Sequence, residues 1–348
     1  MAIQRTEVSP MIARELVALP SYAEEVAQGL TTFPKTLPCK LFYDGAGSEL
    51  FEEITRLPEY YLTRTELEIL SQRADEMAGT IGGDVTVVEL GAGTAMKICP
   101  LLASLSGGQI RVQYFPVDIS RAALNQAKER VESACGQVSV RPVVVDFSDG
   151  FEFLQSIPGK KLVAYLGSSI GNFDPTTAVA MLRQIRRQLA THDMLLLGTD
   201  LVKRRSMLLA AYDDSAGVTE QFNKNILARL NRELLANFDL DSFRHVALWN
   251  PRLSRMEIYL ESLRTQSVSL PVLYLRVNFA EGERIHTENS YKYTLESAKS
   301  MLECSGFVPT HTWFDQRNWF ALHLAMVQPG VEVRPPYARN TRPSTRAA

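Results

Sequence analysis

Several features that would indicate other classes of protein are scarce in this chain of 348 residues. It has four cysteines, which lie far apart and form neither a Cys-x-x-Cys motif nor a Cys/His cluster of the kind that binds zinc. Such cysteines favour reduced thiols in a cytosolic protein. No apolar run reaches transmembrane length, and the first ten residues lack the apolar core of a signal peptide. We therefore expect a cytoplasmic protein that has no metal site and does not bind a membrane.

An excess of charge of either sign is also missing. Lys and Arg number 37 against 39 Asp and Glu, which gives a formal net charge of -2. This balance implies no electrostatic attraction to nucleic acid, so the expected ligand is small. Hydrophobic residues at 45% and charged residues at 22% are typical of a soluble globular protein, and the length suffices for two domains. We expect a monomer.

A strand followed by a glycine-containing turn lies at residues 85–97. The β-branched run ends in Glu89, and Gly91 and Gly93 follow one residue apart. This pattern predicts a buried strand, a tight turn and a helix whose first N–H groups face a nucleotide-like ligand. A dinucleotide fingerprint would have Gly or Ala at the position of Met96, so S-adenosylmethionine (SAM) is favoured over a nicotinamide cofactor. A dinucleotide-dependent oxidoreductase and a SAM-binding protein without turnover remain alternatives.

Strand-like and helical segments alternate from about residue 85 to 200. After the first strand, further strands are expected at 113–120, 140–147, 161–173 and 194–201. This alternation predicts an α/β fold with a doubly wound parallel sheet.

Polar residues end three of these expected strands. Asp118 can accept both ribose hydroxyls of an adenosine cofactor, although a helix N-cap is the simpler alternative. Asp146 can bond the adenine amino group, and Phe147 can stack on or flank the ring. The fourth strand breaks at Gly167 into a polar loop, where Asn172 either holds a substrate or forms a turn.

Residues after the fifth strand form a detour that is too long for an ordinary connection, which predicts a second domain inserted into the sheet. If the segment 285–293 is extended, His286, Glu288, Ser290 and Lys292 share one face, and a solvated strand face is the alternative interpretation. A last helix at 294–307 and a hairpin over 310–326 complete the sheet. The predicted divisions are 62–202 plus 294–328 for a cofactor domain, 10–61 plus 203–293 for a substrate domain, and 329–348 for a disordered tail.

Helix starts are also expected ahead of the first strand. Ser48 is the predicted N-cap of one helix, and Thr63 or Thr65 begins the next. Tyr43, Tyr60 and Tyr61 lie in the turns beside these helices. They are either packing residues or part of a pocket wall.

Six phrases, in order over roughly residues 35–326, together resemble the histidine-specific SAM-dependent methyltransferases of ergothioneine biosynthesis. The phrases are Leu41–Asp44 with Gly47–Phe51, Leu57–Tyr61, Glu89–Gly93, Tyr165–Phe173, Tyr212–Asp214 and Thr287–Ser290. The resemblance implies three successive methyl transfers to the α-amino nitrogen of L-histidine, giving hercynine. It also implies a Rossmann-like class I methyltransferase sheet with a second, α+β substrate domain. The related fungal enzymes that methylate a prenylated tryptophan share the scaffold and are the rival within the family.

The same resemblance implies roles for individual residues. The imidazole is held by Glu288 and Ser290, and the carboxylate and amine by Tyr60, Asn172 and Tyr212. Tyr43 lies near the amine, and Gly167 contributes a backbone contact beside Asn172. The implied catalytic residues are Tyr43 and Asn172. The matching SAM-binding positions are Gly91, Lys97, Asp118, Asp146 and Phe147. Asn289 departs from the apolar residue often found between Glu and Ser, and strand alternation points it away from Glu288.

Overall fold

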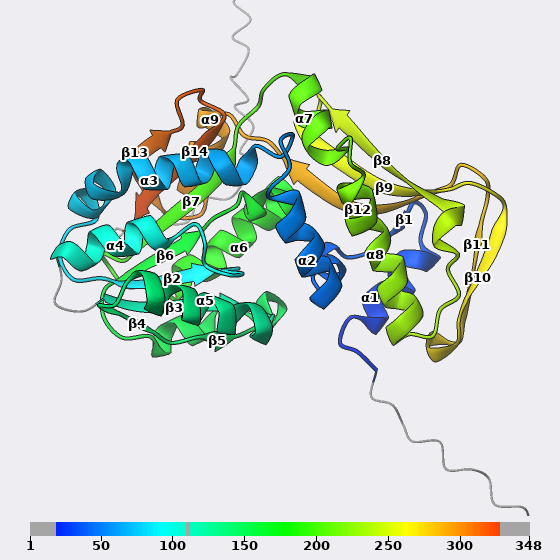
Figure 1. Ribbon diagram of the computed structural model, residues 1–348, viewed down its shortest axis with the longest axis horizontal. Helices are drawn as coiled ribbons and strands as arrows, with labels where there is room; N and C mark the ends of the chain where they lie inside the picture. Colours follow the sequence, from blue (N-terminus) through cyan, green and yellow to red (C-terminus); the bar gives the residue numbers. More distant parts are fainter. Residues whose placement is uncertain (1–18, 109–111, 328–348) are drawn as a thin grey trace, which may run out of the picture.

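The computed structural model describes residues 19–108 and 112–327. The predicted tail at 329–348 and the first residues of the predicted substrate domain lie outside these ranges. Figure 1 shows two lobes, each with its own sheet; helix α2 (Gly45–Ile54) lies between them, and α8 (Val218–Glu233) packs on α2 within the smaller lobe. The division into two domains stays a proposal.

The larger lobe holds an eight-stranded sheet whose main order is β13-β14-β7-β6-β2-β3-β4. A short strand, β5, pairs with β3 beyond the end of β4. All neighbouring strands are parallel except those beside β14, which runs antiparallel to β7 and to β13. The strands are β2 Thr86–Leu90, β3 Val112–Asp118, β4 Val138–Val140, β5 Val143–Val144, β6 Lys161–Tyr165, β7 Met194–Asp200, β13 Val308–Phe314 and β14 Phe320–Met326. The predicted doubly wound α/β sheet is confirmed.

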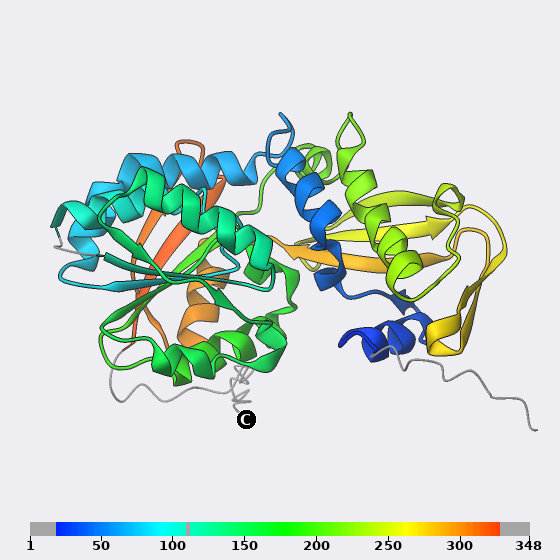
Figure 2. The same cartoon turned by 60° about the horizontal axis from the view of Figure 1, so that its bottom comes forward.

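Alternate residues of the central strands face two different helix layers. On β2, Val88 packs with α6 and α9, whereas Val87 packs with α3, α4 and α5. On β7, Leu195 and Leu196 divide between the same two layers. Figure 2 shows helices on both faces of this sheet. Their bounds are α3 Leu62–Ile81, α4 Cys99–Gly108, α5 Arg121–Ala134, α6 Pro175–Arg187 and α9 Leu295–Cys304.

The smaller lobe is built on a four-stranded sheet of order β1-β12-β9-β8 with a two-stranded ribbon of β10 and β11. The strands are β1 Lys35–Thr36, β8 Phe243–Asn250, β9 Arg255–Ser262, β10 Gln266–Leu270, β11 Leu275–Phe279 and β12 Arg284–Tyr291. Helices α1 (Ala23–Thr31), α2, α7 (Arg205–Tyr212) and α8 share one apolar core with this sheet. Because β1 pairs with β12, the chain ahead of the first central strand and the late insertion form one unit.

The lobes touch where β12 meets the short helix η4 (Ser169–Asn172), which follows β6. A Cβ atom at Gly171 would lie 2.8 Å from the carbonyl oxygen and 3.3 Å from the nitrogen of Tyr291. Only glycine permits this approach without a shift of backbone. The loop that carries Asn172 is therefore packed directly on the strand that carries Glu288 and Ser290.

Four local predictions need correction. Asp44, not Ser48, caps α2, since its carboxylate accepts the Gly47 amide at 2.7 Å. Helix α3 begins at Leu62 with no side-chain cap, and the Thr65 hydroxyl instead donates to the carbonyl of Leu62, inside the helix, at 2.9 Å.

The third and fourth corrections concern strands. The expected strand 140–147 is divided at Arg141 and Pro142 into β4 and β5, which pair with successive parts of β3. The expected row of four side chains on β12 is interrupted between His286 and Glu288 by a shift in register. His286 is thereby moved to the side of Asn289, to which its ring bonds at 3.0 Å.

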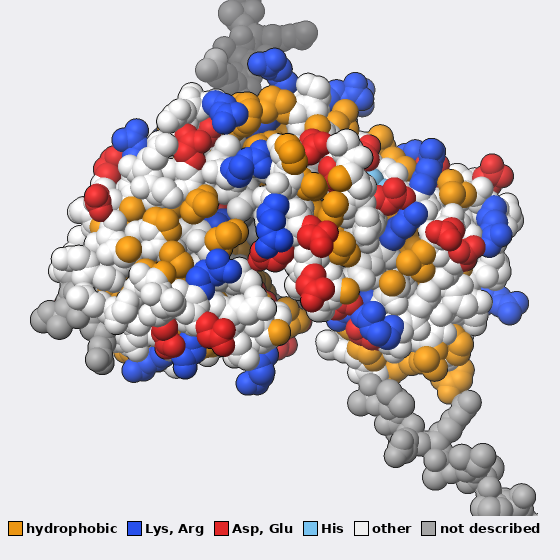
Figure 3. Space-filling view, in the orientation of Figure 1, with side chains coloured by type: hydrophobic (Ala, Val, Ile, Leu, Met, Phe, Trp, Pro, Cys, Tyr) orange, Lys and Arg blue, Asp and Glu red, His pale blue; other side chains and the backbone are white. Residues whose placement is uncertain are grey.

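Positive and negative side chains are interspersed over the face in Figure 3, and the surface is indented between the lobes. Within the part of the chain that the structure describes, no helix combines the length and apolar character that a bilayer crossing needs.

Candidate active site

The turn after β2 is open on the side where a ligand can approach. Gly91 and Gly93 have φ of 68° and 51°, and a Cβ at either would meet no atom within 4 Å. The Gly91 amide donates to the carbonyl of Val117 on β3 at 2.8 Å, so the turn is fixed to the neighbouring strand. Free space beside a fixed glycine turn at the carboxyl end of a parallel sheet is the arrangement that a nucleoside cofactor needs.

Asp118, the last residue of β3, holds this turn in place. One carboxylate oxygen accepts the Gly93 amide at 3.0 Å and the other accepts the Ser120 amide at 2.9 Å. The N-cap of α5 is Ser120, whose hydroxyl accepts from Ala123, so Asp118 is not the cap. Each Asp118 oxygen retains acceptor capacity, as ribose recognition would require.

Asp146 and Phe147 follow β5 at the same edge of the sheet. The Phe147 ring stacks on Phe151 with centroids 5.6 Å apart. Asp146 lines a cavity of about 900 Å³, its open mouth included, together with Ser120. Tyr43, which follows the short helix η1 (Cys39–Phe42), lines the same cavity from the smaller lobe.

Lys97 lies between the glycine turn and the loop after β6. Its ammonium is 2.6 Å from a carboxylate oxygen of Glu66, a fully buried residue of α3. Both Glu66 oxygens also accept the Gly167 amide, at 2.8 and 3.0 Å. A Cβ at Gly167 would lie 2.9 Å from the Lys97 nitrogen. Glu66 therefore connects Lys97, a predicted cofactor-binding residue, to Gly167, which lines a second cavity.

A second cavity, of about 580 Å³ with its opening, contains all seven residues that the sequence assigned to the substrate and to catalysis. These residues come from both lobes, and Tyr43 also lines the cavity beside Asp146. They are Tyr43, Tyr60, Gly167, Asn172, Tyr212, Glu288 and Ser290. The remaining wall is mostly apolar and is formed by Phe51, Ile54, Leu62, Ser168, Ser169, Ala211, Thr219 and Phe222.

Tyr60 and Tyr43 are held in different ways, Tyr60 by polar contacts of its loop and Tyr43 by ring packing. Arg64 donates to the carbonyls of Leu57, Pro58 and Tyr60 at 2.6, 2.7 and 3.0 Å, which fixes the loop before α3. Tyr43 is 38% exposed and packs edge-on against Phe51, with centroids 5.7 Å apart.

Glu288 and Ser290 project from β12 into the cavity. Burial raises the pKa of the Glu288 carboxyl to about 7, and the nearby Lys292 ammonium opposes this rise. The Ser290 hydroxyl lies 2.7 Å from that of Tyr212, at the end of α7. Burial raises the pKa of Tyr212 well above its ordinary value, so this phenol stays protonated at neutral pH.

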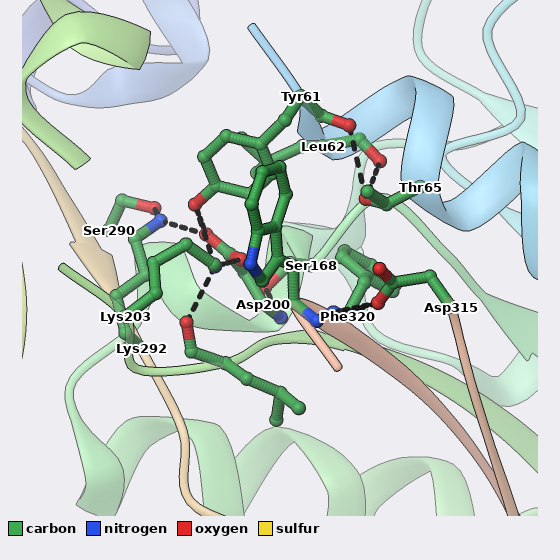
Figure 4. Close-up of polar contacts among 12 residues, drawn as sticks. Tyr61, Leu62, Thr65, Ser168, Asp200, Lys203, Ser290, Lys292, Asp315 and Phe320 are labelled. Atoms are coloured by element: carbon green, nitrogen blue, oxygen red, sulfur yellow. Dashed lines mark hydrogen bonds and ion pairs between the residues drawn. The ribbon is translucent and has the colours of Figure 1, made fainter. Parts of the chain in front are cut away.

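Beneath this wall lies a buried charge cluster, which we define as Asp200, Lys203, Lys292 and Tyr61. Figure 4 shows the three other side chains directed toward Asp200, the last residue of β7. Lys292 is 2.9 Å from one Asp200 oxygen, Tyr61 donates to the same oxygen at 2.7 Å, and Lys203 pairs with the other. Burial alone would raise the pKa of Asp200, but the two ammonium groups hold it below its ordinary value.

Sequence reasoning missed two functional connections. Glu66 carried no motif, and only its burial beside Lys97 shows its place. Asp200 lies within the expected strand 194–201 and Lys292 in the expected polar row, and neither pattern predicts that the two side chains pair. The residue types of Asp200 and Lys292 are a usable signal in the sequence, because an acid or a lysine in apolar surroundings requires a partner of opposite charge.

Comparisons with known proteins agree with this geometry. A family model described as "Histidine-specific methyltransferase, SAM-dependent" matches residues 22–327. The "Histidine N-alpha-methyltransferase" of Mycolicibacterium smegmatis is 44% identical over 87% of this chain and 94% of its own length.

More distant relatives include the "Ergothioneine biosynthesis protein 1" of Neurospora crassa, which is 30% identical over 84% of this chain and 33% of its own length. The "4-dimethylallyltryptophan N-methyltransferase easF" of Claviceps purpurea is 27% identical over 85% of this chain and 92% of its own length. The family match excludes the dinucleotide-dependent oxidoreductase that sequence analysis kept as an alternative. The chain belongs to the family of histidine-specific, SAM-dependent methyltransferases.

Proposed function

We propose that this protein transfers three methyl groups from SAM to the α-amino nitrogen of L-histidine, giving hercynine as the first step of ergothioneine biosynthesis. The observation that carries the proposal is the meeting of Glu288, Ser290, Tyr212 and Asn172 in one cavity. Tyr43 joins this cavity to the one lined by Asp146, which supports a transfer between neighbouring sites.

On the substrate side, Glu288 and Ser290 would hold the imidazole. Tyr60, Asn172 and Tyr212 would hold the carboxylate and amine, with the Gly167 backbone beside them. A carboxylate that accepts a ring N–H rejects side chains that lack this donor, because it would otherwise stay buried and unpaired.

On the cofactor side, Gly91, Lys97, Asp118, Asp146 and Phe147 would bind SAM. The open Gly91 turn and the Asp118 carboxylate beside it support this assignment. When bound, SAM supplies an activated methyl group and a neutral thioether leaving group. For this reason we expect no requirement for a metal ion, and treatment with a chelator should leave the rate unchanged.

The residues of the cavity would then act by position and by exclusion of water. Asn172 and Tyr43 would orient the α-nitrogen so that its lone pair faces the methyl group, and the amine must lose a proton before each transfer. The apolar wall formed by Phe51 and Phe222 would exclude water. The tyrosine rings offer faces that tolerate the growing quaternary ammonium.

The direct test is a panel of amino acids incubated with the purified protein and SAM, with products measured by mass spectrometry. We expect mono-, di- and trimethylated histidine to appear in turn. Methylation of a prenylated tryptophan and not of histidine would favour the fungal type of activity. No methylated product with any substrate would indicate SAM binding without turnover.

A further inference from the structure

Lys292 is completely buried, and each of its three N–H bonds has a partner. Its side chain has 0% exposure, and its nitrogen lies 2.9 Å from Asp200, 2.7 Å from the Tyr212 hydroxyl and 2.8 Å from the Ser290 hydroxyl. An ammonium group can only donate hydrogen bonds. Both hydroxyl oxygens are therefore forced to act as acceptors toward Lys292.

A count of hydrogen atoms then limits what this wall offers a ligand. Tyr212 and Ser290 have one hydroxyl hydrogen each, and one of the two is used in the 2.7 Å bond between them. Only one hydrogen is left to face the cavity. Both side chains line the cavity, and either oxygen can be the donor in their bond. Because Ser290 lies two residues from Glu288 on the same strand, we assign the free hydrogen to Ser290 and the shared one to Tyr212, whose oxygen then faces the substrate amine as an acceptor.

We propose that Lys292, held by Asp200, is a positioning residue that makes Ser290 a hydrogen-bond donor toward the substrate and thereby selects a neutral imidazole. The inference rests on the proposed function. Glu288 accepts the N–H of such a ring, and Ser290 donates to the lone pair of the other ring nitrogen. An aromatic ring without a lone pair in its plane cannot take up the Ser290 hydrogen.

The charge cluster supplies Lys292 with a buried counter-charge. Asp200 accepts from Lys292, Lys203 and Tyr61, and a fully buried carboxylate needs such partners to remain ionised. Lys203 has the same carboxylate partner and donates to Tyr61 at 2.8 Å and to the Leu201 carbonyl at 2.6 Å. No contact of Lys203 with Tyr212 or Ser290 is among the hydrogen bonds of the described residues, so Lys203 provides a matched control.

The test compares Lys292→Met with Lys203→Met. For Lys292→Met we expect the KM for histidine to rise roughly tenfold or more, while the KM for SAM changes by less than about threefold. In Lys203→Met, Asp200 keeps Lys292 and Tyr61 as partners. We therefore expect the KM for histidine to change by less than about threefold in this variant. An unchanged histidine KM in Lys292→Met, or equal increases in both variants, would overturn the inference.

A double-mutant cycle tests whether Lys292 acts through Ser290. In the Ser290→Ala background, Lys292→Met should add less than about twofold to the histidine KM, because its route to the ring is already lost. Full additivity would contradict the proposal. If Lys292→Met alone does not fold, the neutral pair Asp200→Asn with Lys292→Met gives the same comparison against Asp200→Asn with Lys203→Met. Failure of the wild-type protein to methylate histidine would reject the proposed function itself, whereas the variants test only the role of Lys292.

Discussion

The two ends of the candidate active site are built in different ways. The cofactor end is built on a backbone turn and on residues close to it at the carboxyl edge of adjacent strands, where the Gly91 turn is fixed to β3 and to the Asp118 carboxylate. The substrate end is made by side chains from segments that are distant in the sequence, and its wall rests on a buried charge cluster. A substitution at one end should therefore change the binding of one ligand, SAM or histidine, and leave the binding of the other nearly unchanged.

The largest separation is expected for Glu288→Ala. Loss of the carboxylate should lower kcat/KM for histidine by roughly 100-fold, because the ring N–H loses its acceptor. Titration calorimetry should show a SAM affinity within about threefold of wild type. Asn289→Ala is the matched control, since its side chain bonds His286 away from the cavity. Equal losses for both ligands would contradict the separation.

The converse separation is expected for Asp118→Ala. Its carboxylate fixes the glycine turn and is the proposed ribose acceptor, so the Kd for SAM should rise by roughly 30-fold. The KM for histidine, measured at saturating SAM, should stay near wild type. Asp84→Ala, at an exposed site just before β2, provides the control in calorimetry. A histidine KM that rises in parallel would show that the two ends are not independent.

Glu66→Gln should affect both ends at once, because Glu66 contacts Lys97 at the cofactor end and the Gly167 amide at the substrate end. We expect both Michaelis constants to rise by about tenfold, since a charged hydrogen bond to each end is weakened. Steady-state kinetics with each substrate varied in turn would measure this. Glu129→Gln, on the exposed side of α5, should change neither constant. An effect on SAM alone would limit Glu66 to the cofactor end.

A smaller effect is expected from pH at the substrate end alone. The raised pKa of Glu288, about 7, means that the carboxyl is mostly protonated below pH 7 and ionised above it. Because the ionised form accepts the ring N–H, kcat/KM for histidine should rise as pH increases through 7. This rise should be several-fold between pH 6 and 8 and should be absent in Glu288→Gln. Persistence of the same rise in Glu288→Gln would assign it to another group, such as the substrate amine.

Local patterns in the sequence predicted the strand ends and the glycine turn on which the proposed cofactor end is built. The β-branched run before Gly91 and the acid at Asp118 mark strand ends, and parallel strands bring their carboxyl ends to one edge. The cap of α2 could not be predicted in this way. Asp44 and Ser48 are both good caps in isolation, and the contact of Asp44 with Asn225 of α8 at 2.8 Å depends on tertiary packing.

The substrate end required more than local pattern. Alternation along β12 correctly directs Glu288 away from Asn289, but the shift in register before Glu288 reverses the side on which His286 lies. A single extra residue in a strand has no periodic signature. The pairing of Lys292 with Asp200 likewise joins the two sheets: Asp200 is the last residue of β7, and Lys292 directly follows β12. No spacing in the chain predicts this contact.

The close packing of Gly171 on Tyr291 has a consequence for the size of amino acid that fits the site. The backbone contact sets how far Asn172 lies from Glu288 and Ser290, and therefore the span between an α-nitrogen and the far atoms of a side chain. A methyl group at position 171 would move the loop outward by some tenths of an ångström. We expect the length of the accepted side chain to depend on a residue that need not touch the substrate.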